Sequence, residues 1–199
     1  MTATDITPSR RDARIDEIVD IAASLFARSG YTATGVSELC EVVGLGRGAL
    51  YYYIGSKEGV LVRIHDRVLD LILPRGREIL ALDLPADEKL RLFGEATIGA
   101  ITKYPDHCWV FMHEWRVLTG EAAAAFRKRR REYEEVLAAI LGEGVQQGLF
   151  RIPDLRLAVL AWFGMHNYTY QWFRREGRLD AGALAETFHR LFLDGIASS

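Results

Sequence analysis

Apolar residues recur at helical spacing along nearly the whole chain, and no run alternates apolar and polar residues as a half-buried strand would. The first apolar stripe ends before Gly30, a residue type that readily adopts the left-handed conformation found at helix ends. The stripe consists of Ile15, Ile18, Ala22 and Leu25. The pattern predicts an all-α protein.

Two short helices should follow the first one. Apolar residues between Val36 and Val43 predict a helix that Thr34 can cap and that a glycine turn should end. A second short helix is expected from the turn at 46–48 to Ile54, with Leu50 one turn earlier on the same buried face. The spacing therefore predicts a helix-turn-helix arrangement.

A long amphipathic helix is expected from Ser56, its cap, to Leu73, where Pro74 should stop it. We expect this helix to connect an N-terminal domain of residues 1–57 with a larger helical domain of residues 58–199. Within the larger domain, apolar spacing predicts helices over 87–103, 105–118, 121–147, 154–174 and 180–196.

The composition is that of a folded protein, with 199 residues of which 49% are hydrophobic. Cys40 and Cys108 lie far apart and lack metal-ligand spacing, so we expect buried thiols rather than a disulfide or a zinc site.

Neither a signal peptide nor a membrane-spanning stretch is evident, which predicts a cytoplasmic protein without membrane contact. The formal charge of −2 means that any DNA binding must rest on a local arrangement of cations.

The stretch GLGRGALYYYIGSK, residues 44–57, carries the most distinctive chemistry. With its apolar residues buried, the second short helix presents an outer face made of Arg47, Gly48, Tyr51 and Tyr52. Hydroxyl and guanidinium groups donate to phosphates, and arginine also reads guanine. Ser56 and Lys57 add a helix N-terminus suited to phosphate. On these residues alone, a packing or oligomer face stays open as an alternative.

Residues 12–65 resemble the TetR family of transcription regulators. GYTATGVSELCEVVGLGRGALYYYIGSKEGVL is similar to the family's glycine-aromatic-threonine entry, short helix, glycine turn, leucine-tyrosine pair and serine-lysine-glutamate. The resemblance implies DNA contacts, mostly to phosphates, by Thr34, Arg47, Gly48, Tyr51, Tyr52, Tyr53 and Lys57. Gly46 departs from the small hydroxyl residue usual in the family, so we expect base reading by Arg47 and Tyr52. Basic residues near the start form either an arm against DNA or a solvated cluster: Arg10, Arg11 and Arg14.

The same resemblance implies that the larger domain dimerises and encloses a small-molecule effector. Two aromatic-rich runs, HCWVFMHEWRVL and WFGMHNYTYQWFRREG, should supply its core and part of a pocket. Polar side chains within these runs need partners once buried, either one another or a ligand. The candidate ligand-binding residues are His113, Trp115, His166, Asn167 and Tyr170.

The second run also resembles, more weakly, regulators of fatty-acid, steroid or aromatic-acid breakdown, many of which respond to acyl-CoA thioesters. Arginines in FRKRRREYEE could bind the phosphates of such a ligand, or they could be solvated and paired with nearby glutamates. The last two helices carry a wide apolar face, and the resemblance implies that they pair with their copies in a four-helix homodimer interface. This face consists of Leu184, Phe188, Leu191 and Phe192.

No nucleophile elbow, helical zinc-protease motif or phosphate loop occurs, so we expect no enzyme, no catalytic residues, no metal site and no cofactor. The leading hypothesis is a transcription repressor that binds palindromic operator DNA as a homodimer and is released by a small apolar effector such as an acyl-CoA. The alternative is a cytosolic small-molecule-binding or adaptor protein that does not bind specific DNA. Gly46 and the negative net charge favour this alternative.

Overall fold

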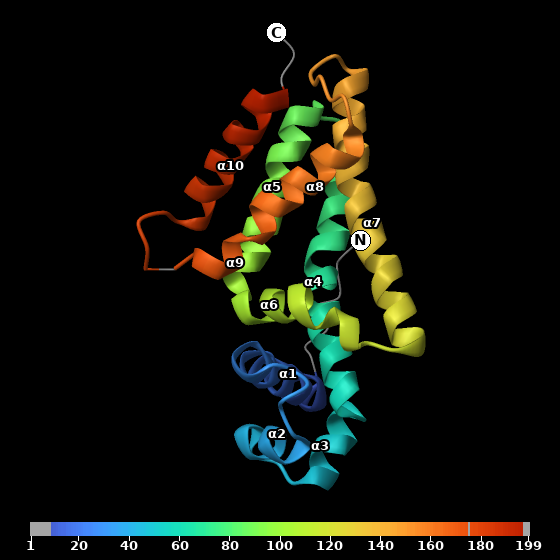
Figure 1. Ribbon diagram of the computed structural model, residues 1–199, viewed down its shortest axis with the longest axis vertical. Coiled ribbons are helices and arrows are strands. Elements are labelled where there is room, and N and C mark those ends of the chain that lie inside the picture. Colours follow the sequence, from blue (N-terminus) through green and yellow to red (C-terminus); the bar gives the residue numbers. More distant parts are fainter. Residues whose placement is uncertain (1–8, 175, 197–199) are drawn as a thin grey trace.

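The computed structural model describes residues 9–174 and 176–196, and the regular elements of this part of the chain are helices (Figure 1). In chain order they are α1 (Arg10–Ser29), α2 (Val36–Val43), α3 (Arg47–Ile54), α4 (Lys57–Leu80), α5 (Ala86–Lys103), α6 (Pro105–His113), the 3-10 helix η1 (Glu114–Val117), α7 (Gly120–Gln146), α8 (Leu155–Asn167), α9 (Thr169–Trp172) and α10 (Ala181–Ile196). The predicted all-α class is confirmed.

Helices α1, α2 and α3 form a small N-terminal unit at one end of the molecule (Figure 1). Ser9 starts α1 with a reciprocal capping box, in which its hydroxyl oxygen accepts the Asp12 N–H. Gly44 ends α2 with φ +71°, a left-handed conformation that glycine adopts without steric cost. The buried side chains of α1 to α3 include Ile18, Phe26, Leu39 and Leu50, and they belong to an apolar core that continues into the rest of the molecule.

One sequence prediction for this unit is wrong. Thr34 does not cap α2, because Gly35 occupies the cap position and makes no side-chain bond. The Thr34 hydroxyl instead donates to the Gly30 carbonyl at 2.8 Å, within the turn that follows α1. Its side chain is therefore part of the turn between α1 and α2.

Helix α4 leaves the N-terminal unit and runs up into the rest of the molecule (Figure 1). Ser56 caps it as predicted, with its hydroxyl oxygen accepting the Gly59 N–H at 2.9 Å. The expected stop at Pro74 is wrong, since the helix continues to Leu80. A proline removes one helical hydrogen bond, and packing of the later turns on α5 and α7 outweighs that loss. Because α4 packs on both parts of the molecule, the domain boundary expected at residue 57 stays a prediction.

Helices α5 to α10 form the C-terminal unit. Its centre contains Phe93, Leu137, Ile140 and Trp162, and α10 lies along α5 (Figure 1). Two long helices expected from the sequence are each interrupted. The segment 105–118 changes to a 3-10 helix after His113, and the segment 154–174 breaks at Tyr168 between α8 and α9.

Both cysteines are buried free thiols, as expected, and burial raises the pKa of the Cys108 thiol to about 12. No helix in the described part of the chain has the length and apolar content needed to span a membrane.

Candidate nucleic-acid interface and ligand pocket

Helix α3 has one buried side and one open side. Leu50 and Ile54 face the core at 1% and 5% exposure, whereas Tyr52 is 67% exposed. The remaining open positions of this side are Arg47, Gly48 and Tyr51. Space within 4 Å of a β-carbon at position 48 is empty, so a partner surface could approach the backbone closely.

Two arginines border this open side. The Arg47 guanidinium donates to the Ser37 hydroxyl of α2 at 2.7 Å, which holds it at the junction of the two short helices. The Arg11 guanidinium of α1 lies 5.5 Å from the centre of the Tyr52 ring, within cation-π range. The structure therefore brings a cation from the N-terminal arginine cluster to the open side of α3, here called the α3 face, despite the negative net charge.

The other predicted DNA contacts sit deeper. The Lys57 ammonium donates to the Tyr31 carbonyl and lies 4.1 Å from the centre of the Tyr31 ring. Burial is the main cause that lowers the Lys57 pKa. Thr34 is 1% exposed, and Tyr53 is half-buried with its ring against Tyr52. Lys57 thus stabilises the turn between α1 and α2, and DNA contacts by these three side chains stay predictions.

Polar contacts from α6 and η1 hold the N-terminal unit against the C-terminal unit. The Tyr31 N–H donates to Glu114 Oε1 at 3.0 Å, and the Ser24 hydroxyl donates to Asp106 at 2.5 Å. Next to them, Arg67 of α4 pairs with two carboxylates of α1, Asp16 and Asp20. The sequence offered no signal for these contacts, because their partners are far apart along the chain.

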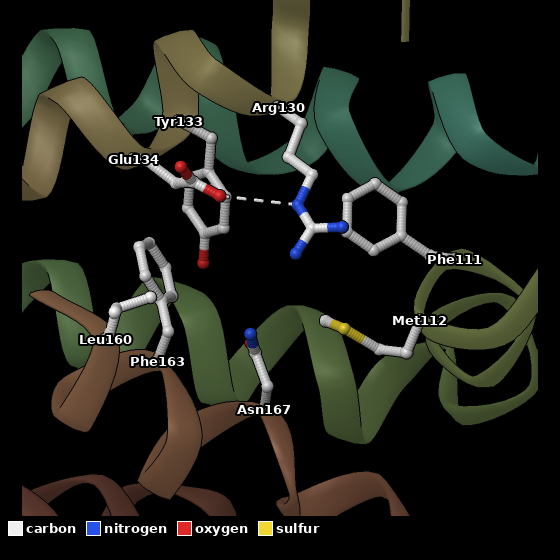
Figure 2. Close-up of a pocket in the computed structure, with 8 residues that line it drawn as sticks. All are labelled: Phe111, Met112, Arg130, Tyr133, Glu134, Leu160, Phe163 and Asn167. Carbon is white, nitrogen blue, oxygen red and sulfur yellow. Dashed lines mark hydrogen bonds and ion pairs between the residues drawn. The ribbon is translucent and has the colours of Figure 1, made fainter. Parts of the chain in front are cut away.

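A cavity of about 60 Å³ lies among α6, α7 and α8 in the C-terminal unit (Figure 2). Its walls are Phe111, Met112, Arg130, Tyr133, Glu134, Leu160, Phe163 and Asn167. Arg130 pairs with Glu134 at 3.3 Å along one wall, and the Asn167 amide points toward the space between them and Met112 (Figure 2). The cavity is therefore mostly apolar, and its polar side chains are one cation, one carboxylate, one amide and the Tyr133 phenol.

Of the five predicted ligand-binding residues, the structure places Asn167 in this cavity wall. His113 and Tyr170 pair with each other instead, with the phenol oxygen 3.3 Å from Nε2 of the imidazole. His166 is buried at 1% exposure, where Nδ1 is 2.9 Å from the Trp162 carbonyl oxygen and the two rings stack. These side chains do not gather around one space.

Trp115 lies just outside the cavity, beside one of its lining residues. The guanidinium of Arg130 is 5.6 Å from the centre of the Trp115 ring. The sequence leaves Arg130 open between phosphate binding and a solvated surface, because it stands in a run of five consecutive basic residues, and it is not among the five predicted ligand-binding residues. The i, i+3 and i+4 spacing of Arg130, Tyr133 and Glu134 is the signal that could have placed them on one inward face.

The C-terminal unit also exposes apolar surface along α8. Leu157, Leu160 and Tyr168 are 61%, 55% and 62% exposed, and with Gly164 between them they form one stripe, here called the α8 face. The apolar face predicted at Leu184, Phe188, Leu191 and Phe192 lies on α10 and is divided in the structure. Leu184 is buried against Ile98 of α5, while Leu191 is 63% exposed.

Within the described residues, no group of three or more histidine, cysteine, aspartate or glutamate side chains could hold a metal ion.

Two family models match the chain. The model described as bacterial regulatory proteins, tetR family, matches residues 18–64, which include α2 and α3. The model described as tetracyclin repressor-like, C-terminal domain, matches residues 83–196.

Individual relatives match over most of their length. The transcriptional repressor KstR2 of Rhodococcus jostii (strain RHA1) is 28% identical over 197 residues, covering 96% of this chain and 94% of the relative. The crystal structure of the TetR-family regulator PfmR from Thermus thermophilus is 35% identical, with a TM-score of 0.81 over 89% of this chain and 97% of that one. AibR, crystallised with isovaleryl coenzyme A and operator DNA, is 27% identical, with a TM-score of 0.79 and the same coverage.

Proposed function

The chain belongs to the TetR family of bacterial transcription regulators, and from that membership we propose that it is a cytoplasmic repressor whose homodimer leaves operator DNA when an acyl-CoA thioester binds. The observation that carries the proposal is the open side of α3, with Arg47 and Tyr52 outward and Leu50 inward. An eight-residue helix presented in this way fits the DNA major groove.

The α3 face supplies the two kinds of contact that such a complex needs. Arg47 can read a guanine edge with its paired N–H groups, and tyrosine hydroxyls can donate to phosphates. Arg11 beside Tyr52 adds a cation at the edge of this face. Local charge of this kind supports DNA binding by a chain whose net charge is −2.

The α8 face supports the homodimer. Leucines at 61% and 55% exposure on one helix leave apolar surface in water, and a second copy would bury that surface. Pairing of two copies by two-fold symmetry also matches a palindromic operator, in which two recognition helices enter successive major grooves about 34 Å apart.

The cavity supports a ligand with an anionic part and a small apolar part. Phe111, Met112 and Phe163 provide apolar walls, while Arg130 offers a guanidinium that can bind phosphate. A short acyl-CoA has both features, and AibR was crystallised with isovaleryl coenzyme A. We therefore place a short-chain thioester first among the candidates.

Operator binding and release test the proposal directly. The purified protein should shift DNA from upstream of its own gene at physiological salt in the presence of excess random duplex. Isovaleryl-CoA should reverse this shift, whereas free isovalerate and free CoA, each of which lacks one half of the ligand, should act more weakly. Equal affinity for the upstream DNA and random duplex would instead favour the small-molecule-binding or adaptor protein. Specific binding that no thioester reverses would keep the repressor and exclude this effector class.

A further inference from the structure

His65 is a buried polar residue for which the fold provides no polar partner. It lies in the middle of α4 at 1% exposure, and neither ring nitrogen has a hydrogen-bond partner. Its ring instead packs against two phenylalanines, with centroid distances of 4.7 Å to Phe126 and 5.7 Å to Phe111. A leucine of similar size would fill this space without leaving a donor and an acceptor unpaired. The imidazole therefore lowers the free energy of unfolding relative to leucine at this position.

One side chain, that of Phe111, lies between His65 and the cavity. The Phe111 ring contacts His65 and also lines the cavity, beside the Arg130 guanidinium (Figure 2). Phe111 is 2% exposed, and its ring packs between the cavity that it lines and the His65 ring of α4. A rotation of this ring would expose the imidazole to whatever occupies the cavity.

The size of the cavity requires some movement of this kind. A volume of about 60 Å³ is well below the roughly 150 Å³ that admits benzene in an engineered protein cavity. A branched acyl group is comparable to benzene in bulk, so it cannot enter without displacing a wall. Met112 and Phe111 are adjacent lining residues on α6, and a displaced Phe111 would both enlarge the cavity and extend it to α4.

On the basis of the proposed function, we infer that His65 is the polar anchor of the effector, donating an N–H hydrogen bond to its thioester carbonyl oxygen after Phe111 turns aside. The imidazole is suited to this role as a neutral donor, because burial lowers its pKa to about 4. The carbonyl would then satisfy a group that is unpaired in the free protein. Because His65 belongs to α4, the ligand would also gain a direct contact with the helix that leads to the N-terminal unit.

The test uses two ligands that differ in one oxygen atom, namely isovaleryl-CoA and its thioether analogue 3-methylbutyl-CoA, which lacks the carbonyl. Calorimetric titration of the full-length protein should show that the wild type binds the thioester about tenfold more tightly, the factor that one hydrogen bond of about 1.4 kcal/mol corresponds to. His65→Leu should bind the two ligands equally. His65→Gln, which keeps an N–H donor of similar reach, should retain part of the preference. Cooperative unfolding of each variant serves as the control for folding, and His65→Phe replaces His65→Leu if the latter does not fold.

The outcomes separate this inference from the proposed function. If the wild type prefers the thioester and His65→Leu keeps that preference in full, the effector class stands and the role of His65 is wrong. If the wild type binds both ligands equally, no group reads the carbonyl and the inference is overturned while acyl-CoA binding remains. If the wild type binds operator DNA but neither ligand, the effector class is wrong and the anchor role fails with it.

Discussion

Acid should destabilise this protein through His65 before most carboxylates are protonated. Burial lowers the pKa of His65 from 6.5 to about 4. Above pH 6.5 the imidazole is neutral in both the folded and the unfolded chain, so it causes no pH dependence there. Between these two pKa values the unfolded chain binds a proton that the folded chain does not, and the free energy of unfolding falls as the pH falls.

The expected size follows from the same two values. Each tenfold difference in proton affinity corresponds to about 1.4 kcal/mol, so the complete loss below pH 4 is about 3 kcal/mol, and about 2 kcal/mol is lost by pH 5. His166 is buried in the same way, and its pKa is also lowered to about 4, so the wild type should lose a comparable amount at that residue. Against a total stability of about 5–15 kcal/mol, these losses are easily measured.

Denaturant unfolding of the wild type and His65→Leu at several pH values between about 8 and 5 isolates this contribution. Carboxylates and the other histidines titrate in both proteins, so they cancel in the difference between the two curves. The stability of the variant should fall by about 2 kcal/mol less over this range, and the same comparison with His166→Leu should give a similar value. Parallel curves for the wild type and His65→Leu would show that His65 is hydrated or paired, and would refute the assignment of a buried, neutral, unpaired imidazole.

Three further variants, with one control, test the proposed DNA-binding and dimer surfaces. Arg47→Ala should cost about 1–3 kcal/mol of operator affinity and relax sequence preference if the side chain reads a base, as binding to a panel of single-substitution operators would reveal. Lys57→Ala should lower the free energy of unfolding by about 2 kcal/mol, because the bond to the Tyr31 carbonyl is lost, and an unchanged melting temperature would contradict this. The same variant should weaken binding to specific and random DNA by the same factor. Leu157→Arg should give a monomer in sedimentation analysis and abolish operator binding, whereas Leu82→Arg, at an exposed leucine in the loop after α4, should leave the dimer intact.

The N-terminal helices could be predicted closely because local sequence determines their ends. Glycine at 44 and serine at 56 terminate or cap a helix through their own backbone and side-chain chemistry. Local rules failed where tertiary packing opposed them. Pro74 would end an isolated helix, but α4 continues because its later turns pack on α5 and α7.

The cavity proposed as the ligand pocket could be predicted only in part for a related reason. Helical spacing shows which residues share a face, but it does not show which faces meet across the fold. A polar side chain in an apolar helix marks Asn167 as a candidate, and Asn167 lines the cavity. Arg130 stands in a basic run, where its spacing to Tyr133 and Glu134 is the one local sign of an inward position. His65 stands in the helix expected to connect the two domains, and no local pattern distinguishes it from its apolar neighbours.

A second set of contacts, besides α4, connects the cavity with the N-terminal unit, and effector binding could change the position of that unit through them. Arg130 in the cavity wall lies over the Trp115 ring, and the preceding residue, Glu114, accepts the Tyr31 N–H at 3.0 Å. A phosphate that draws Arg130 away from Glu134 would remove a contact from Trp115 and so act on the segment that holds the N-terminal unit.

The free energies involved are sufficient for regulation. A ligand that prefers the released conformer by about 3 kcal/mol weakens DNA binding roughly 150-fold, and by linkage DNA weakens ligand binding by the same factor. A hydrogen bond to a charged group contributes about 1.5–3 kcal/mol, and one to a neutral group about 1 kcal/mol. Loss of the Glu114 contact together with gain of the His65 contact is therefore of the size needed to supply this bias. Such a ligand must make these contacts unequally in the two conformers, since equal contacts would give tight binding and no release.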